Sequence, residues 1–205
     1  MHNDRQLTAG SRQLILGIDT STSILDVAIF DESGEVLASE ISDNERTHSE
    51  RVMLAVDSVM AKAKLKLADI DVFACCTGSG SYTGVRIGVA TAKGLALATG
   101  KEVKGISSFM LMSHKAVRSE KLGVSIFIPI IDARRGAVFA AAYKLSTVNS
   151  QLSTVMEPQR IDLEELKARF AGQDYQLIEP HGGKWQGVTM DMLGGVDIVY
   201  LGGSV

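Results

Sequence analysis

Two polar segments of the chain carry residue types that could bind phosphate. The first is Asp19-Thr20-Ser21-Thr22, an acid followed by hydroxyls between two apolar runs. A carboxylate with hydroxyls at a turn can hold a hydrated cation and hydrogen-bond a phosphate oxygen. Asp, Ser and Thr also favour plain turns, because they bond their own backbone there. The local sequence alone favours the plain hairpin turn.

The second segment is the small-residue loop 77–84, which leads into a helix. Backbone N–H groups around Gly78 and Gly80 could cradle an anion at the N-terminus of that helix. The loop is not a P-loop, because no Gly-Lys-Ser/Thr follows, and its glycine spacing does not match the dinucleotide fingerprint. The sequence leaves a phosphate loop and a purely structural loop equally open.

The positions of the four histidines do not indicate a metal site or a catalytic nucleophile. His2, His48, His114 and His181 are scattered, and no two lie at the i, i+4 spacing that places two imidazoles on one metal. No metal or catalytic residue is therefore expected. His48 stands beside a predicted helix start, where a solvated or locally bonded role is typical.

Three arginines are candidates for contacting an anion or a partner. Arg134 and Arg135 stand in a predicted hairpin turn, and Arg86 follows the glycine-rich loop. A guanidinium can bind a carboxylate, a phosphate or an acid of a partner, although arginines in turns are usually only solvated.

The periodicity predicts two sheets with helices. Three antiparallel strands are expected first, over residues 14–41, and a capping box at Thr47 and Glu50 starts a helix to about residue 67. The remaining elements are strands over 71–76, 102–106, 124–131, 137–145 and 196–201, and helices over 83–99, 107–119 and 162–170.

Composition describes a soluble globular chain. Its 205 residues are 45% hydrophobic and 22% charged, with a net charge of −3 and no dense basic run. Autonomous nucleic-acid binding is therefore not expected. No apolar stretch approaches the roughly 18 residues of a membrane span, and the polar start lacks the core of a signal peptide. The chain is predicted to be cytoplasmic, with residues 1–13 as a flexible leader and the adjacent Cys75 and Cys76 reduced.

Five motifs together resemble the TsaB (YeaZ) family, bacterial proteins required for making threonylcarbamoyladenosine in tRNA. In order they are LGIDTST (16–22), THSE (47–50), GSGSYTGVRIG (78–88), AKGLA (92–96) and IDARRG (131–136). The resemblance covers about residues 14–143. It implies a mixed α/β fold of the actin, sugar-kinase and Hsp70 ATPase class, with subdomains over 14–103 and 104–205. The second subdomain is short for the family.

The resemblance implies a partner and not a catalyst. In that family TsaD transfers the threonylcarbamoyl group to adenosine 37 of tRNAs that read ANN codons, and TsaE joins as an ATPase. The chain would then bind TsaD as a heterodimer and form a homodimer in isolation. It would contact tRNA only through the complex and need no cofactor of its own, with ATP used in the complex. The histidine pair of TsaD would fall near Ser108 and Met112, which are not imidazole ligands.

The two long helices are the predicted partner surface. Packed side by side, they would form half of a four-helix bundle with TsaD or with a second copy. The predicted interface residues are Val52, Val56, Val59, Met60, Ala63, Gly84, Gly88 and Ala92. The alternative is that the small-residue stripe packs internally against the sheet.

Three other functions remain open at this point. One is an ATP-binding or phosphotransfer enzyme of the same fold class, in which Asp19 positions a cation and the loop 77–84 holds phosphate. Another is a metallopeptidase-like protein, which the missing ligand pair disfavours. The last is a homodimeric binding module.

Overall fold

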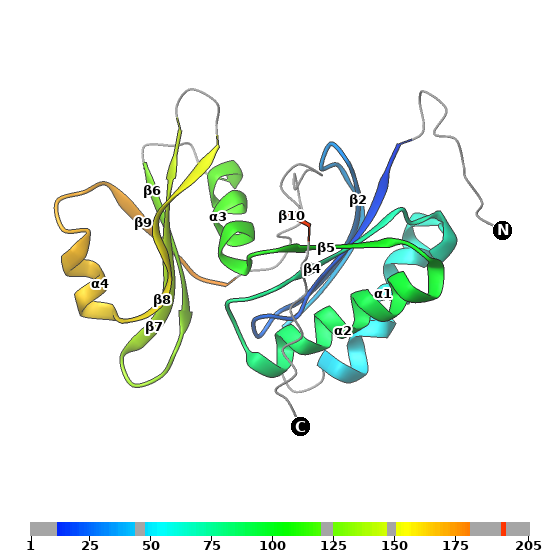
Figure 1. Ribbon diagram of the computed structural model, residues 1–205, viewed down its shortest axis with the longest axis horizontal. Coiled ribbons are helices and arrows are strands. Elements are labelled where there is room, and N and C mark those ends of the chain that lie inside the picture. The colour runs from blue at the N-terminus through cyan, green and yellow to red at the C-terminus, as the bar shows by residue number, and fades with distance from the viewer. Residues whose placement is uncertain (1–11, 44–47, 120–124, 147–150, 181–193, 196–205) are drawn as a thin grey trace.

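The computed structural model describes residues 12–43, 48–119, 125–146, 151–180 and 194–195. Two mixed sheets carry helices on their faces, and one helix lies between the sheets (Figure 1). No described helix is both long and apolar enough to cross a membrane.

The first sheet has the strand order β10-β5-β4-β1-β2-β3. Its antiparallel meander is β1 (Leu14–Asp19), β2 (Leu25–Asp31) and β3 (Val36–Ser42). Next come β4 (Val72–Cys76) and β5 (Glu102–Ile106), both parallel to β1, and the short β10 (Gly194–Gly195) beside β5. All residues of β2 and β4 are buried, because elements cover both faces of the sheet.

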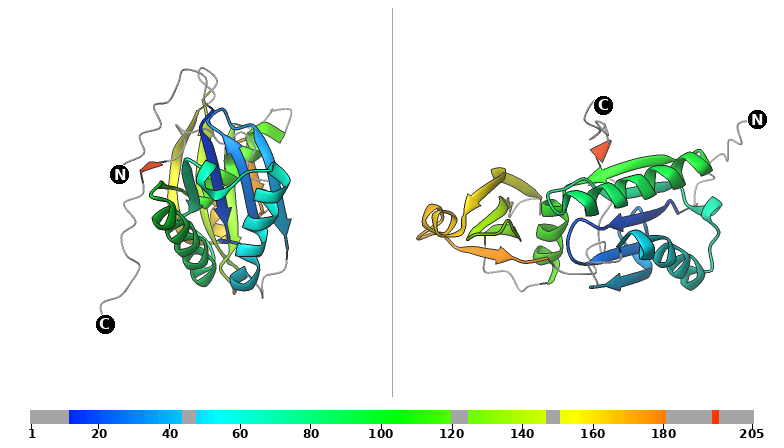
Figure 2. Two further views of the ribbon diagram at one scale, coloured as in Figure 1. Left: turned by 90° about the vertical axis from the view of Figure 1, so that its right-hand side faces the viewer. Right: turned by 90° about the horizontal axis from the view of Figure 1, so that it is seen from below.

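Two helices lie side by side on one face of this sheet (Figures 1 and 2). They are α1 (His48–Ala63) and α2 (Tyr82–Thr99). The first ends before the predicted residue 67 because Lys64 has a φ of 58°, and the 3-10 turn η2 (Leu67–Asp69) follows. The second ends at Gly100, whose φ of 67° suits a left-handed cap.

The helix α3 (Ser108–Ser119) packs against both sheets (Figure 1). Leu111 contacts the apolar side chains on the other face of the first sheet. Phe109 and Met112 pack among residues of the second sheet, and both are fully buried. This apolar contact joins the two halves of the molecule.

The second sheet has the order β8-β7-β6-β9. Its strands are β6 (Ile126–Asp132), β7 (Ala137–Leu145), β8 (Leu152–Asp162) and β9 (Tyr175–Ile178). The helix α4 (Leu163–Arg169) packs on its outer face and is capped by Asp162, which accepts a hydrogen bond from the Glu164 N–H. The sequence analysis did not predict β8 and β9.

Two mixed sheets with flanking helices confirm the predicted mixed α/β architecture. The expected subdomain border between residues 103 and 104 falls inside β5, so the first sheet extends to Ile106, and β10 joins it as well. The strand predicted over 196–201 and the capping residue Thr47 lie outside the described residues.

Within the predicted leader, Arg12 and Gln13 contact the β2–β3 turn. Arg12 pairs with Asp31 and Glu35, and the buried Asp31 also accepts bonds from the Ser33 hydroxyl and from backbone N–H groups of the turn. Burial raises the pKa of Asp31, but these hydrogen bonds and Arg12 outweigh it and lower the pKa from 3.8 to about 2.

We expect acid to destabilise the fold through Asp31. Because its folded pKa lies below its unfolded value of 3.8, the contribution is complete above that value and is lost as the pH falls toward about 2. Asp31→Asn should lower the free energy of unfolding by about 1–3 kcal/mol at neutral pH and flatten its decline between pH 4 and 2. Urea denaturation across this range measures both effects. The neighbouring exposed Glu32→Gln is the matched control, and an equal loss in both variants would contradict the assignment.

Candidate functional site

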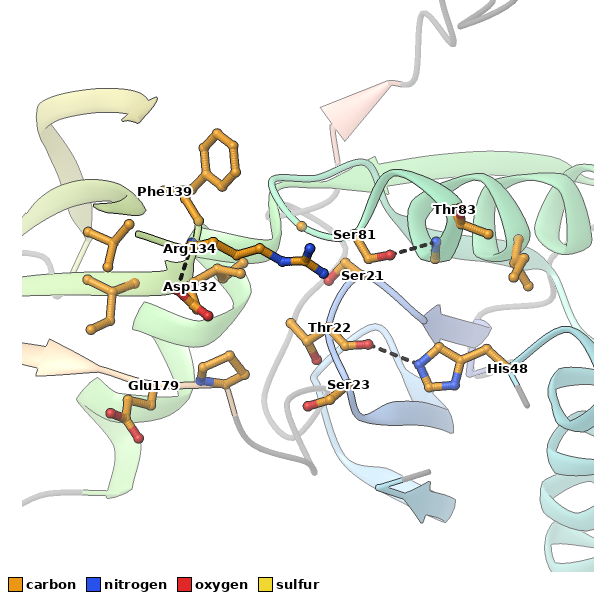
Figure 3. Close-up of a pocket in the computed structure, with 18 of the residues that line it drawn as sticks. Ser21, Thr22, Ser23, His48, Ser81, Thr83, Asp132, Arg134, Phe139 and Glu179 are labelled. Atoms are coloured by element: carbon orange, nitrogen blue, oxygen red, sulfur yellow. Dashed lines mark hydrogen bonds between the residues drawn. The ribbon is translucent and has the colours of Figure 1, made fainter. Parts of the chain in front are cut away.

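A pocket of about 1040 Å³ lies between the two sheets. The first half of the chain contributes the turn after β1 and the first turns of α1 and α2, and the second half contributes the ends of β6 and β9 and the turn after β6. Figure 3 shows side chains from both halves around one space.

The turn after β1 is tied to α2 by short hydrogen bonds. Thr20 Oγ1 donates to the Gly84 carbonyl at 2.6 Å, and the Ser81 N–H donates to the Ser21 carbonyl at 2.7 Å. Asp19 Oδ1 accepts from the Ser21 N–H at 2.8 Å. Three of the residues that the sequence suggested for phosphate binding line the pocket, namely Ser21, Thr22 and Gly80.

The other three candidates for phosphate binding, Asp19, Thr20 and Gly78, do not line the pocket. Asp19 and Thr20 are buried at 0% and 1% exposure beneath the turn, and they and Gly78 are not among the residues that line the pocket. Asp19 is therefore badly placed to hold a cation in the pocket, which weighs against the phosphotransfer alternative.

The small-residue stripe of α2 packs inside the molecule, which corrects its assignment to the partner interface. A Cβ at Gly84 would lie 2.0 Å from the Thr20 carbonyl oxygen, and one at Gly88 would lie 2.6 Å from Thr20 Oγ1. Ala92 is fully buried in the same core. The glycines are needed because the helix backbone touches the turn after β1.

The face of α1 that was predicted to bind a partner also packs against the core. Four of its residues are buried against the sheet, and Ala63 is half-buried at the edge of the same cluster. The four are Val52, Val56, Val59 and Met60. An apolar helical stripe marks the side facing the core, so it could not locate a partner surface.

The outer faces of the two helices carry apolar residues that the sequence analysis missed. On α1, Met53 and Leu54 are 44% and 66% exposed, and on α2 Leu97 is 87% exposed. Gly94 also faces outward, and a Cβ there would meet nothing within 4 Å. The sequence does carry a signal for this surface, because these large apolar residues lie outside the helical stripe that faces the core.

His48 is buried and not solvated, which corrects the expectation from sequence. Its Nε2 lies 2.9 Å from the Thr22 carbonyl oxygen, 26 residues away, and only 6% of the residue is exposed. The bond links the start of α1 to the turn after β1 (Figure 3). A contact between residues so far apart in sequence has no local signature.

The three candidate arginines occupy different places. Arg134 lines the pocket, and its backbone N–H donates to Asp132 Oδ1 at 2.8 Å. Arg135 stands in the same turn but not among the lining residues, and both have positive φ values, 64° and 56°. Arg86 lies on the exposed side of α2, with its guanidinium carbon 5.2 Å from the centre of the Tyr82 ring.

The described residues offer no prepared metal site. No group of three or more His, Cys, Asp or Glu in the described ranges could hold a metal ion. Ser108 and Met112 are both fully buried. Burial raises the pKa of Cys75 to about 12, so its thiol stays protonated at neutral pH.

Comparison with known proteins identifies the family. A family model described as "TsaD: tRNA N6-adenosine threonylcarbamoyltransferase" matches residues 35–186. The tRNA threonylcarbamoyladenosine biosynthesis protein TsaB of Bacillus subtilis (strain 168) is 34% identical over 172 residues, which cover 80% of this chain and 72% of the relative. The chain belongs to the TsaB (YeaZ) family.

Other TsaB relatives agree. The Escherichia coli (strain K12) TsaB is 36% identical over 130 residues, which are 63% of this chain and 54% of that protein. The chain thus spans about half the length of this relative. The solved structure of YeaZ from Pseudomonas aeruginosa superposes with a TM-score of 0.70 at 26% identity, covering 81% of this chain and 75% of that one.

Proposed function

We propose that the chain is a non-catalytic partner subunit that supports TsaD in forming threonylcarbamoyladenosine at position 37 of tRNAs that read ANN codons. The observation that carries the proposal is its membership in the TsaB family, whose curated relatives are tRNA threonylcarbamoyladenosine biosynthesis proteins.

The outer face of α1 and α2 is the proposed docking surface for TsaD. It exposes Met53, Leu54 and Leu97, three large apolar side chains that water solvates poorly. Small residues at Ala90 and Gly94 on the same side of α2 would let a partner helix approach closely. The two helices would thus form half of a four-helix bundle, completed by TsaD or by a second copy of the chain.

The rest of the complex follows from the same proposal. TsaE would join the pair and use ATP, while the chain alone would need no cofactor and would form a homodimer in the cytoplasm. With a net charge of −3, the chain would contact tRNA only through its partners, because phosphate contacts need clustered Lys and Arg.

The test is reconstitution with TsaD from the same organism. Light scattering after size-exclusion chromatography should show a heterodimer in the mixture and a homodimer for the chain alone. Adding the chain to TsaD, TsaE and a threonylcarbamoyl donor should raise tRNA modification at least tenfold over TsaD and TsaE alone. A chain that forms no complex and leaves modification unchanged would contradict the proposal.

A further inference from the structure

The outer face of α1 carries negative charge. Its bases Arg51 and Lys62 are directed to one acid of β3, because Lys62 Nζ lies 2.6 Å from Glu40 Oε2 and Arg51 also attracts that carboxylate. Glu50 and Asp57 are exposed on the same helix, and neither belongs to an ion pair of the described residues. The charge that remains on this face is therefore acidic.

The outer face of α2 carries positive charge. The helix contains Arg86 and Lys93 and no Asp or Glu. Arg86 is exposed and lies over the neutral Tyr82 ring, and Lys93 is half-buried. A partner that neutralises both helices must therefore present bases to α1 and acids to α2.

The two helices start at the same place and run in the same direction. His48 Nε2 lies 2.9 Å from the Thr22 carbonyl oxygen, and the Gly84 carbonyl accepts from Thr20 Oγ1 at 2.6 Å, so both helices begin beside the turn after β1. They lie side by side on the sheet (Figure 2) and lead into β4 and β5, which are parallel. Residues equally far from His48 and from Gly84 therefore lie at the same height, since each helical residue adds the same rise.

Two outward stripes lie at matching heights on these helices. Their members are separated by four, three and four residues, which is the spacing of the contact seam in a left-handed helical bundle. The stripe of α1 is Glu50, Leu54, Asp57 and Ala61, and the stripe of α2 is Arg86, Ala90, Lys93 and Leu97. All of them except the half-buried Lys93 are exposed.

The two stripes complement one another at every height. Each acid of α1 is level with a base of α2, and each leucine of one helix is level with an alanine of the other. Opposite charges attract, and a large apolar side chain fills the space that a small one leaves. A second copy whose helices run parallel to those of the first offers the stripe of α2 to α1 and the stripe of α1 to α2. A two-fold axis along the helices forms this contact twice.

The antiparallel arrangement is less favourable. It places α1 on α1 of the second copy and α2 on α2, so that each charged residue meets an apolar residue or a charge of its own sign. Both contacts cost free energy, because a charge loses water without gaining a counter-charge.

We propose that two copies of the chain associate in parallel, with α1 of each copy packed on α2 of the other in the register of the two stripes. The inference rests on the docking surface of the proposed function and adds the orientation of the homodimer and the charge pairs that fix it. Because salt screens ion pairs near the surface, the homodimer dissociates more readily as the ionic strength rises.

Disulfide cross-linking of the full chain tests the orientation. Leu54→Cys on one copy should cross-link to Ala90→Cys on the other, so oxidation of an equal mixture should give covalent dimers, and oxidation of either variant alone should give few. The native Cys75 and Cys76 are 0% and 2% exposed and do not compete. A mixture without covalent dimers, or Leu54→Cys alone giving as many as the mixture, would overturn the proposal.

Binding of the reduced variants to TsaD separates this inference from the proposed function. TsaD binding by variants that cross-link in no combination would overturn the parallel homodimer and leave the proposed function standing. Cross-linking in the mixture without TsaD binding by the wild type would support the parallel homodimer and contradict the proposed function.

Exchanging charges tests the pairing. Glu50→Lys and Arg86→Glu should each weaken the homodimer about tenfold, because each places like charges at the same height. The two changes combined in one chain restore opposite charges and should recover the wild-type affinity within about threefold. Light scattering over a range of protein concentrations measures the dissociation constant.

Glu165→Lys is the matched control for Glu50→Lys. Glu50 and Glu165 are both exposed acids in the first turn of a helix, but Glu165 lies in α4 on the second sheet. Glu165→Lys should leave the homodimer unchanged. Equal weakening by the two variants, or a double variant as weak as the single ones, would mean that Glu50 and Arg86 do not pair across the interface and would overturn the proposal.

Discussion

Gly84→Ala is expected to lower the free energy of unfolding by about 1–3 kcal/mol, although alanine is the better helix former. The new Cβ would lie 2.0 Å from the Thr20 carbonyl oxygen, far inside van der Waals contact. The turn that carries this oxygen is already hydrogen-bonded to the start of α2 through Thr20 Oγ1 and the Ser21 carbonyl. The oxygen therefore has little freedom to move away. The helix or the turn after β1 must shift.

Gly94→Ala in the same helix is the matched control. A Cβ there meets nothing within 4 Å, so only helix propensity acts and the variant should gain about 0.5–1 kcal/mol. Chemical denaturation of both variants measures the difference. Two stabilised variants would mean that the close contact between α2 and the turn does not exist in solution.

The same contact changes how a variant at Gly88 must be interpreted. A large side chain there would collide with Thr20 Oγ1 inside the protein, so loss of TsaD binding by Gly88→Leu would report misfolding and not a blocked interface. The interface has to be tested at residues that face outward.

The sequence predicted the elements whose pattern is local. The meander, the helices over α2 and α3 and the β6–β7 hairpin lie within a few residues of their predicted bounds. By contrast, β8 was missed because it is a mostly exposed edge strand without apolar alternation, and β9 because it has only four residues.

The site was predicted less well, because its geometry depends on contacts between distant residues. Ser21, Thr22, Gly80 and Arg134 were singled out by type, and the structure places them at one pocket. The burial of His48 and the inward direction of the glycine stripe depend on how α1 and α2 pack on the turn after β1. A small-residue stripe says that something packs closely, but not whether it is the same chain.

Leu97→Glu is expected to weaken the complex with TsaD by about 30-fold or more. Leu97 is the most exposed large apolar residue of the described chain, on the outer side of α2. In the proposed four-helix bundle it would be buried by the partner, and a carboxylate there would lose its water without gaining a counter-charge. The isolated chain should keep its stability, because the residue is solvated in the monomer. Calorimetric titration with TsaD measures the affinity.

Val155→Glu provides the control, since Val155 is also exposed but lies on β8 of the second sheet, away from α1 and α2. Leu54→Glu on α1 should weaken TsaD binding to a similar extent as Leu97→Glu. The double variant should bind TsaD no more tightly than the single variant with the lower affinity. If Val155→Glu alone weakened TsaD binding, the partner would dock on the exposed β8 edge, and the bundle would be wrong. Losses at Leu54 and Leu97 together, with Val155 unaffected, require a partner that covers both helices at once, as a four-helix bundle does.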